Sequence, residues 1–186
     1  KCRIFLIVFF SIAVIFASAQ DKSITLKHFT SEDGLSDNQV TCILRDNFGF
    51  IWVGTKDGLN RFDGKEFYVF KNDPDNPNSI CGNSIKCIEM DADSLLWIGT
   101  TNNGFCNYNS KNGKFETYNK DNSLLVRNNV NDICFDAGKN ILWLGLNNFG
   151  LQTFDLKTKR ISNNPLIISE NTYYDIERKD TIVYYA

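Results

Sequence analysis

Three tryptophans recur along the chain at almost constant intervals, at Trp52, Trp97 and Trp143. They lie 45 and 46 residues apart, and each sits in a segment of the form aliphatic-Trp-aliphatic-Gly. A period of about 45 residues is typical of repeat architectures, in which every repeat is one supersecondary unit. Residues that recur in each unit usually build the unit, so the pattern favours a structural role over catalysis.

Other positions keep the same register. An asparagine precedes each unit, and a glycine follows each tryptophan segment: Asn38, Asn83 and Asn128, then Gly58, Gly104 and Gly150. The apolar segments are four to six residues long and bounded by Gly, Asn or Asp, which is typical of β-strands. No sustained 3.6-residue apolar period occurs outside the N-terminus. Each unit is therefore expected to be a meander of four antiparallel strands.

The expected fold is all-β, a β-propeller built of four-stranded antiparallel blades. The repeat places blades at residues 38–70, 83–118 and 128–163, a closing outer strand at 23–30, and a partial blade at 171–186. About three and a half blades are then present. In this last unit Tyr184 takes the place of the tryptophan. Because a partial propeller leaves strand edges unpaired, we expect the chain to be part of a longer protein.

The three tryptophans are predicted to lie in the core between blades. The second strand of a blade is covered on both faces by its neighbours, and a buried tryptophan removes about 200 Å² from water. This corresponds to roughly 5 kcal/mol of gross transfer free energy. Stacking against a ligand is the weaker alternative.

The first 19 residues have the pattern of a signal peptide. Lys1 and Arg3 give a positive start, residues 4–16 are apolar, and residues 17–19 (Ala-Ser-Ala) supply a cleavage site. The apolar run is short for a membrane-spanning helix. We therefore expect residues 20–186 to form the mature domain, in the periplasm.

Charge and cysteine content limit the classes of partner and cofactor. The net charge of −2 gives no basic surface, so this segment is not expected to contact nucleic acid, and a membrane would be contacted only through C-terminal parts outside the chain. The predicted mature domain has five cysteines: Cys42, Cys81, Cys87, Cys106 and Cys134. Burial as small apolar side chains is favoured, with a disulfide or metal role as the alternative. With His28 as the only histidine, zinc is disfavoured.

One face of the expected propeller collects polar loop residues. In an antiparallel meander, the loop between the second and third strands lies on the same face as the connection between blades. The candidate ligand-binding residues on this loop face are Asp37, Asn38, Lys56, Asp57, Asn83, Thr101, Asn102, Asn103, Arg127, Asn128, Asn147 and Asn148. Amides suit hydroxyl groups of a ligand, but Asn and Asp are also common turn formers, and both interpretations stay open.

Motifs for catalysis are weak or missing. The single histidine rules out an argument for a Ser-His-Asp triad, and the chain has no GxSxG, P-loop or HExxH motif. The paired acids at residues 73–75 and 91–93 do not continue into a calcium-binding loop. No catalytic residue, metal site or cofactor is predicted for this chain.

With these residues assembled, the chain resembles the N-terminal periplasmic sensor region of the hybrid two-component system family, which carries two-component regulator propeller repeats. The resemblance rests on residues 33–38 (Asp-Gly-Leu-Ser-Asp-Asn) and on residues 46–64, which end in Lys-Asp-Gly-Leu-Asn-Arg-Phe-Asp-Gly. It implies seven-bladed propellers in a longer protein, a membrane span, a cytoplasmic histidine kinase, oligosaccharide ligands and a homodimer. Leu146 departs from the repeat, and His28 lies in a strand context that does not suit a phospho-acceptor.

We therefore expect a non-catalytic, extracytoplasmic sensing module that recognises an oligosaccharide or another polar small ligand. One alternative is an enzyme that uses the propeller as a scaffold, such as a lyase or a glycosidase. The other is a propeller with a structural or protein-interaction role and no small ligand.

Overall fold

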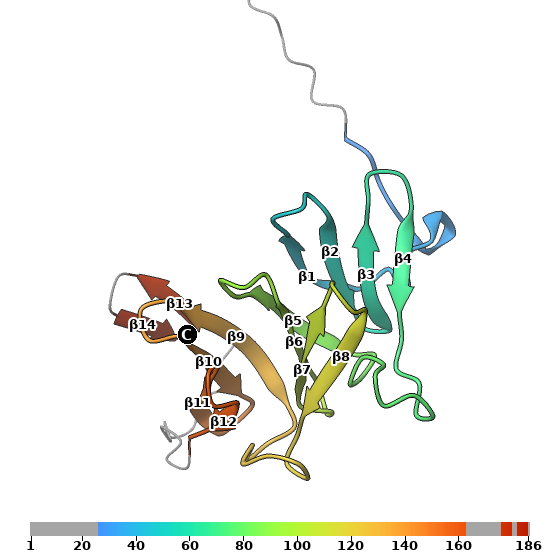
Figure 1. Cartoon of the computed structure of the whole chain (residues 1–186). Helices are drawn as coiled ribbons and strands as arrows, with labels where there is room; N and C mark the ends of the chain where they lie inside the picture. Colours follow the sequence, from blue (N-terminus) through green and yellow to red (C-terminus); the bar gives the residue numbers. More distant parts are fainter. Residues whose placement is uncertain (1–25, 163–175, 180–181, 186) are drawn as a thin grey trace, which may run out of the picture.

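A computed structural model describes residues 26–162, 176–179 and 182–185, the last two ranges by their backbone. Three four-stranded antiparallel sheets dominate these residues (Figure 1). The first comprises β1 (Val40–Arg45), β2 (Ile51–Thr55), β3 (Gly58–Phe62) and β4 (Phe67–Phe70). The second comprises β5 (Ile85–Met90), β6 (Leu96–Thr100), β7 (Phe105–Asn109) and β8 (Lys114–Tyr118). The third comprises β9 (Val130–Asp136), β10 (Ile141–Leu146), β11 (Gly150–Asp155) and β12 (Arg160–Ile161).

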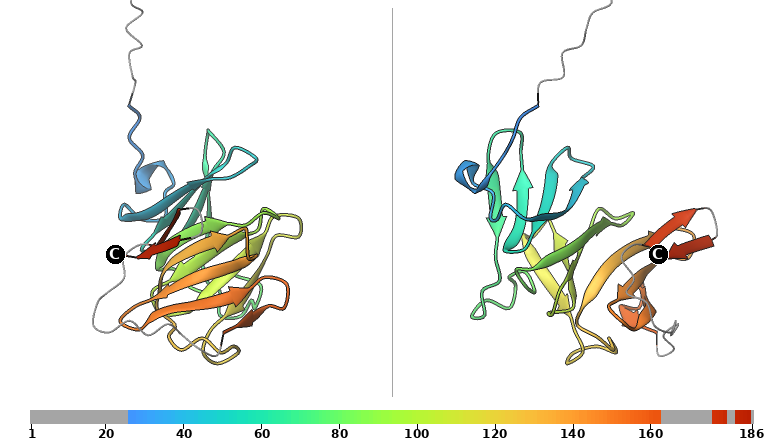
Figure 2. Two further views of the ribbon diagram at one scale, coloured as in Figure 1. Left: turned by 90° about the vertical axis from the view of Figure 1, so that its left-hand side faces the viewer. Right: turned by 180° about the vertical axis from the view of Figure 1, so that it is seen from behind.

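The three sheets lie next to one another in sequence order, each rotated relative to the one before it (Figures 1 and 2). Within each, the strands pair in sequence order, and the first strands of successive sheets contact one another: β1 with β5, and β5 with β9. The first strands therefore lie innermost and the fourth strands outermost. The predicted all-β propeller of four-stranded antiparallel blades is confirmed. We refer to the three sheets as the first, second and third blades.

The repeated tryptophan is held by an aspartate six residues before it. Asp46 Oδ2 accepts a hydrogen bond from Trp52 Nε1 at 2.8 Å, and Asp91 Oδ2 accepts one from Trp97 Nε1 at the same distance. The other oxygen of Asp46 accepts two backbone N–H groups of the turn between β1 and β2. One carboxylate thus shapes the turn and satisfies the indole N–H as the ring becomes buried.

The third tryptophan differs from the first two. Trp52 and Trp97 are 3% and 2% exposed, as predicted for core residues, whereas Trp143 is only partly buried and packs against Cys134 and Leu151. The spacing from the aspartate to the tryptophan is one residue longer here, because Asp136, the last residue of β9, stands seven residues before Trp143. Among the described residues, Trp143 Nε1 has no hydrogen-bond partner. The core prediction therefore holds for the first two tryptophans and only partly for the third.

The glycine two residues after each of the first two tryptophans allows adjacent blades to approach closely. A Cβ atom on Gly54 would lie 2.7 Å from Ile85 Cγ2, and one on Gly99 would lie 2.9 Å from the Val130 carbonyl oxygen. Each glycine also lies under a cysteine sulfur of its own blade, from Cys42 and Cys87 respectively. The aliphatic-Trp-aliphatic-Gly segment therefore supplies both a bulky core residue and a close backbone contact.

The predicted closing strand at 23–30 is not formed in its described part. Residues 26–30 belong to no strand, and a short 3-10 helix, η1 (Ser31–Asp33), follows with Thr30 as its cap. A strand needs a neighbour for its backbone hydrogen bonds, and no strand of the described ranges pairs with these residues. The segment is held instead by Phe29, whose ring packs edge-on against Phe62 and Phe67.

The final repeat is described only as a backbone hairpin. It consists of β13 (Ile176–Lys179) and β14 (Ile182–Tyr185), which pair antiparallel with Tyr184 opposite Glu177. This is the pairing that Trp97 makes with Glu89 in the second blade, so Tyr184 occupies the expected register. The predicted signal peptide and the start of the partial blade at 171–175 lie outside the described residues. The described part contains no helix whose length and apolar character would allow it to cross a membrane.

Glu89 provides a test of the contact between the second and third blades. Its Oε1 accepts a hydrogen bond of 3.0 Å from the Phe135 backbone N–H, and burial raises the pKa of the carboxyl group above its usual value. Because the pKa of Glu89 is higher in the folded state than in the unfolded state, the folded protein is favoured while the carboxyl group is protonated. This stability is lost as the pH rises from the pKa of the unfolded state through that of the folded state. We expect Glu89→Gln to abolish this loss while keeping the acceptor oxygen. Urea denaturation of both proteins between about pH 4 and pH 7 measures the difference, and parallel curves would contradict the assignment.

Candidate functional site

Five of the twelve predicted ligand-binding residues line one cleft on the loop face, at the junction of the second and third blades. The cleft has a volume of about 330 Å³. Its lining residues are Asn102, Arg127, Asn128, Asn129, Asn147 and Asn148. They come from the turn between β6 and β7, the connection that enters β9, and the turn between β10 and β11. We call this the loop-face cleft.

Backbone hydrogen bonds fix these three segments relative to one another. The Gly104 N–H donates to the Asn128 carbonyl at 2.8 Å, and the Asn147 N–H donates to the Asn129 carbonyl at 3.1 Å. Gly104 has a φ of 80°, which favours glycine and lets the turn bend toward the connection. The cleft is therefore preformed by the chain itself rather than assembled from loose loops.

Asn129, which lines the cleft, has an unpaired side-chain acceptor. Its side-chain Oδ1 is buried, and no described residue donates a hydrogen bond to it. An unsatisfied buried amide oxygen costs free energy, so it would gain from a donor such as a hydroxyl group. Asn129 was not among the predicted residues, because the asparagine that recurs in the repeat is Asn128 and not its neighbour. The run of polar residues at 127–129 was the available signal.

Arg127 brings the one charged side chain among the six lining residues. Its guanidinium group lies 5.6 Å from the centroid of the Phe149 ring, in the turn that also carries Asn147 and Asn148. This contact holds the cation beside the cleft while leaving it exposed. The cleft thus offers amides, one cation and a nearby aromatic ring.

The repeated asparagines have a structural role. Each uses its side-chain oxygen to accept a backbone N–H of the segment that precedes it: Asn38 from Ser31 at 2.7 Å, Asn83 from Asn72 at 2.7 Å and Asn128 from Lys120 at 2.9 Å. Their recurrence is explained by this fastening of the chain as it enters a blade. Of the three, only Asn128 lines the loop-face cleft.

The remaining predicted residues lie outside the cleft. Asp57 pairs with Lys71 at 2.6 Å, and Asp37 Oδ1 accepts the Gln39 N–H at 2.6 Å. The other three are placed by local contacts: Lys56 N–H donates to the Gln39 carbonyl, the Thr101 hydroxyl contacts Ser84 Oγ, and Asn103 packs over Gly82. We find no reason in these contacts to group them with the cleft.

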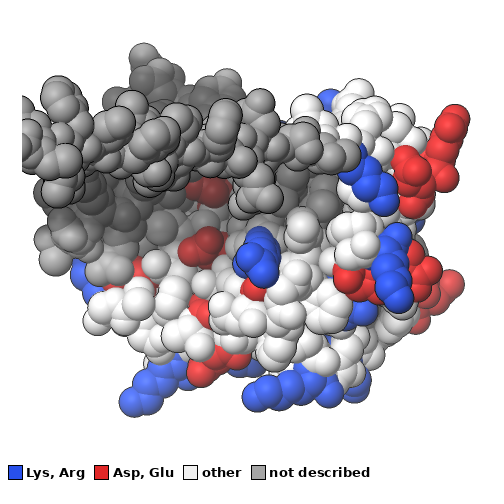
Figure 3. Space-filling view, turned by 90° about the horizontal axis from the view of Figure 1, so that it is seen from above, with Lys and Arg blue, Asp and Glu red and all other residues white. Residues whose placement is uncertain are grey.

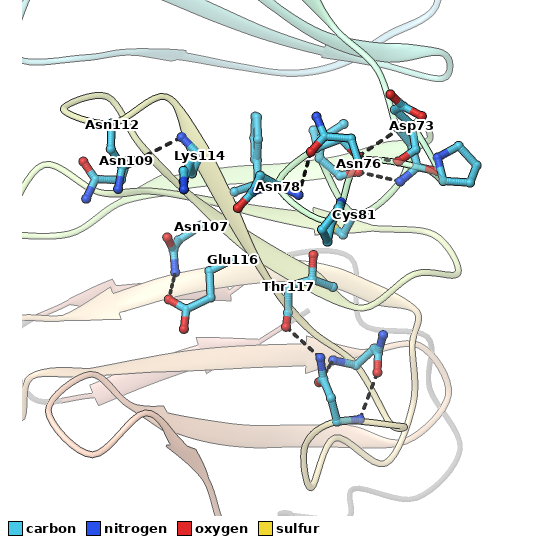
Figure 4. A pocket seen from close by; sticks show the side chains of 18 of the residues that line it. Asp73, Asn76, Asn78, Cys81, Asn107, Asn109, Asn112, Lys114, Glu116 and Thr117 are labelled. Atoms are coloured by element: carbon cyan, nitrogen blue, oxygen red, sulfur yellow. Dashed lines mark hydrogen bonds between the residues drawn. The ribbon is translucent and has the colours of Figure 1, made fainter.

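A second and larger cleft, of about 740 Å³, lies along the outer strand β8 (Figure 4). We call it the rim cleft. Many of its lining residues are amides whose oxygens are already engaged in their own turns. The acceptors include Asn76, Asn109 and Asn112, each bonded to the backbone N–H two residues on, and Asn119, bonded to two N–H groups. These asparagines are turn formers.

A three-residue polar cluster occupies one end of the rim cleft. Glu116 Oε2 accepts hydrogen bonds from Lys159 Nζ at 2.6 Å and from Asn107 Nδ2 at 3.3 Å. Burial acts to raise the pKa of Glu116, but the bonds from Lys159 and Asn107 outweigh it, so the pKa lies below its usual value. The cluster links the second blade to the third and is satisfied without a ligand.

Charge is distributed rather than gathered on the described surface seen in Figure 3, where acidic and basic side chains are interspersed. Within the described ranges, no three His, Cys, Asp or Glu side chains lie close enough together to hold a metal ion.

One family model matches two segments of the chain. The family model described as two component regulator propeller matches residues 34–57 and 79–102. A 77-residue stretch is 43% identical to histidine kinase P4 of Formosa agariphila, and it covers 41% of this chain and 6% of that protein.

Two solved structures with the same fold are extracellular domains of putative hybrid two component systems from B. thetaiotaomicron. One is 27% identical with a TM-score of 0.75 and covers 86% of this chain and 23% of its own. Another, at 22% identity and a TM-score of 0.62, covers 75% of this chain and 18% of its own, and shows the fold alone. The chain therefore spans less than a quarter of the length of these proteins.

Proposed function

Because the chain carries two-component regulator propeller repeats, we propose that it is a ligand-sensing module of an extracytoplasmic sensor, and that the loop-face cleft binds a polar ligand such as an oligosaccharide. The likeness to extracellular domains of hybrid two component systems supports the location. The N-terminal pattern of a signal peptide agrees with it.

The observation that carries the proposal is the buried and unpaired oxygen of Asn129. Once the Asn129 side chain turns this oxygen toward the cleft, a ligand hydroxyl group can donate to it and accept from a neighbouring amide N–H, which is how amides suit sugars. Arg127 and Phe149 at the edge of the cleft add a cation and an apolar ring face. The small volume, about 330 Å³, suits one or two sugar units rather than a long chain.

The similarity to these relatives supports the proposed signalling partners. In this proposal the module is part of a longer histidine kinase that is anchored in the inner membrane through other segments. Ligand binding would be passed on through a homodimer of that protein. This part of the proposal rests on the similarity to histidine kinase P4 and to hybrid two component systems.

Calorimetric titration with a panel of defined oligosaccharides tests the proposal on the complete extracytoplasmic region. Asn129→Ala removes the unpaired acceptor and is expected to weaken binding about tenfold, which corresponds to about 1.4 kcal/mol. The ligand should be recovered unchanged after titration.

Asn78→Ala is the matched control, because this exposed amide lines the rim cleft instead. Its affinity should equal that of the unmodified protein. If Asn78→Ala weakens binding and Asn129→Ala does not, the rim cleft is the site. Product formation would favour an enzyme, and silence across the panel would contradict oligosaccharide sensing.

A further inference from the structure

In the first blade, a buried amide on the third strand fastens the connection that enters the blade. Asn60 Oδ1 on β3 accepts the Ser36 N–H at 2.8 Å, and Asn60 Nδ2 donates to Ser36 Oγ at 2.9 Å. Asn60 is fully buried. These two residues occupy fixed places in the repeat: one is two residues before the repeated asparagine, and the other is two residues after the repeated glycine.

The third blade uses the same two places in the same way. Gln152 on β11 is buried, its Oε1 accepts the Val126 N–H at 3.0 Å, and its Nε2 donates to the Leu124 carbonyl at 3.1 Å. Val126 and Gln152 stand where Ser36 and Asn60 stand in the first blade. An amide therefore ties the connection to the third strand in both blades.

In the second blade, both places are cysteines. Cys81 corresponds to Ser36, and Cys106 on β7 corresponds to Asn60. Their sulfurs lie 3.0 Å apart, only about 1 Å more than the length of a disulfide bond. Cys81 is 7% exposed and Cys106 is 0% exposed. Neither place carries an amide side chain in this blade. The contact between the connection and the third strand, which an amide makes in the other two blades, is made here by the two sulfurs.

We propose that Cys81 and Cys106 are a disulfide site, whose bond replaces the amide tie and fastens the connection before the second blade to β7. The proposal draws on the extracytoplasmic location only for the presence of an oxidant. It does not depend on ligand binding.

The oxidant is a disulfide donor, either a thiol–disulfide oxidoreductase or oxidised glutathione. The Cys81 thiolate attacks the donor disulfide, forms a mixed disulfide and releases one donor thiol. The Cys106 thiolate then attacks Cys81 Sγ, which forms the Cys81–Cys106 bond and releases the second donor thiol. The two cysteines are oxidised, the donor disulfide is reduced, and both thiol protons end on the donor sulfurs.

The structure indicates which sulfur reacts first. Cys81 lines the rim cleft (Figure 4), whereas Cys106 is fully buried. The pKa of the Cys81 thiol is raised, mainly by its hydrogen bond to Cys106 and secondly by burial. Because the thiolate is the attacking species, oxidation is expected to be fast during folding and slow once the reduced protein has folded.

Peptide mapping of the full chain tests the proposal directly. The protein is folded in a buffer of reduced and oxidised glutathione, denatured, alkylated without reduction and digested. We expect the peptides that contain Cys81 and Cys106 to be joined and two hydrogens lighter than their sum, with Cys42, Cys87 and Cys134 alkylated. Alkylation of both Cys81 and Cys106, or a bond from either to another cysteine, would overturn the proposal.

Thermal denaturation with and without reductant tests the fastening role. A bond across residues 81–106 is expected to raise the Tm by about 10 °C, so reductant should lower it by that amount. The double variant Cys81→Ser with Cys106→Asn recreates the pair of the first blade. It should melt above the reduced protein and be insensitive to reductant, while Cys134→Ala keeps the full sensitivity. A Tm of the unmodified protein that is independent of reductant would contradict the role.

Discussion

Replacing Trp97 with alanine is expected to lower the free energy of unfolding by about 3–5 kcal/mol. The ring is 2% exposed and packs on Phe105, Tyr118 and Phe154, with centroids 5.3 to 6.1 Å away. Its removal leaves a cavity between the second and third blades. The Asp91 carboxylate also loses the indole N–H at 2.8 Å and stays largely buried. Urea denaturation monitored by circular dichroism measures the change.

Trp143→Ala is the matched control. This ring has the same place in the repeat, but it is only partly buried, and its N–H has no partner among the described residues. We expect a loss of about 1–2 kcal/mol. Equal losses of unfolding free energy for the two variants would contradict this account, because they would show that the contribution of a tryptophan does not depend on how deeply its ring is buried.

Gly104→Ala is expected to cost about 3 kcal/mol or more. The residue has a φ of 80°, a left-handed conformation that penalises a side chain by about 1–2 kcal/mol. A Cβ atom would also overlap the Tyr118 carbonyl oxygen, which is rigid backbone. Relief of that overlap would displace the turn between β6 and β7, with an added cost of about 1–3 kcal/mol.

Gly113→Ala separates the two contributions, because Gly113 has a similar φ of 71° but no atom within 4 Å of the added Cβ. It should cost about 1 kcal/mol, the conformational penalty alone. Chemical denaturation of the two variants gives the difference. Equal costs would mean that the close approach of the connection to β7 does not constrain this turn.

Most of the fold could be predicted from the sequence repeat. The recurrence of asparagine, tryptophan and glycine predicted blades at 38–70, 83–118 and 128–163. In the structure, the three four-stranded sheets run from Val40 to Phe70, from Ile85 to Tyr118 and from Val130 to Ile161. The reason is physical: the strands are short, and each is bounded by turn residues whose side chains bond their own backbone, as Asp46 does.

Features that depend on neighbours in space were not predictable from the repeat. Residues 26–30 have the composition of a strand, but a strand forms only against a partner. Trp143 matches Trp97 in sequence, yet the spacing from Asp136 to Trp143 is one residue longer than that from Asp91 to Trp97.

The candidate site could be predicted only in part, because some of its features depend on which residues are neighbours in space. The loop face and five residues of the cleft follow from strand alternation, which places alternate loops on one face. Asn129 does not, because its importance lies in the absence of a donor for Oδ1 among the described residues. The pairing of Cys81 with Cys106 likewise appears only when the blades are compared in space.

Hydrogen–deuterium exchange with and without a bound oligosaccharide tests the central claim most directly. We predict that the ligand slows exchange at the backbone amides of residues 101–104, 127–129 and 147–149, which surround the loop-face cleft. Residues 107–122, along the rim cleft, should exchange at the same rate in both states. Protection confined to residues 107–122 would contradict the assignment of the loop-face cleft as the ligand site.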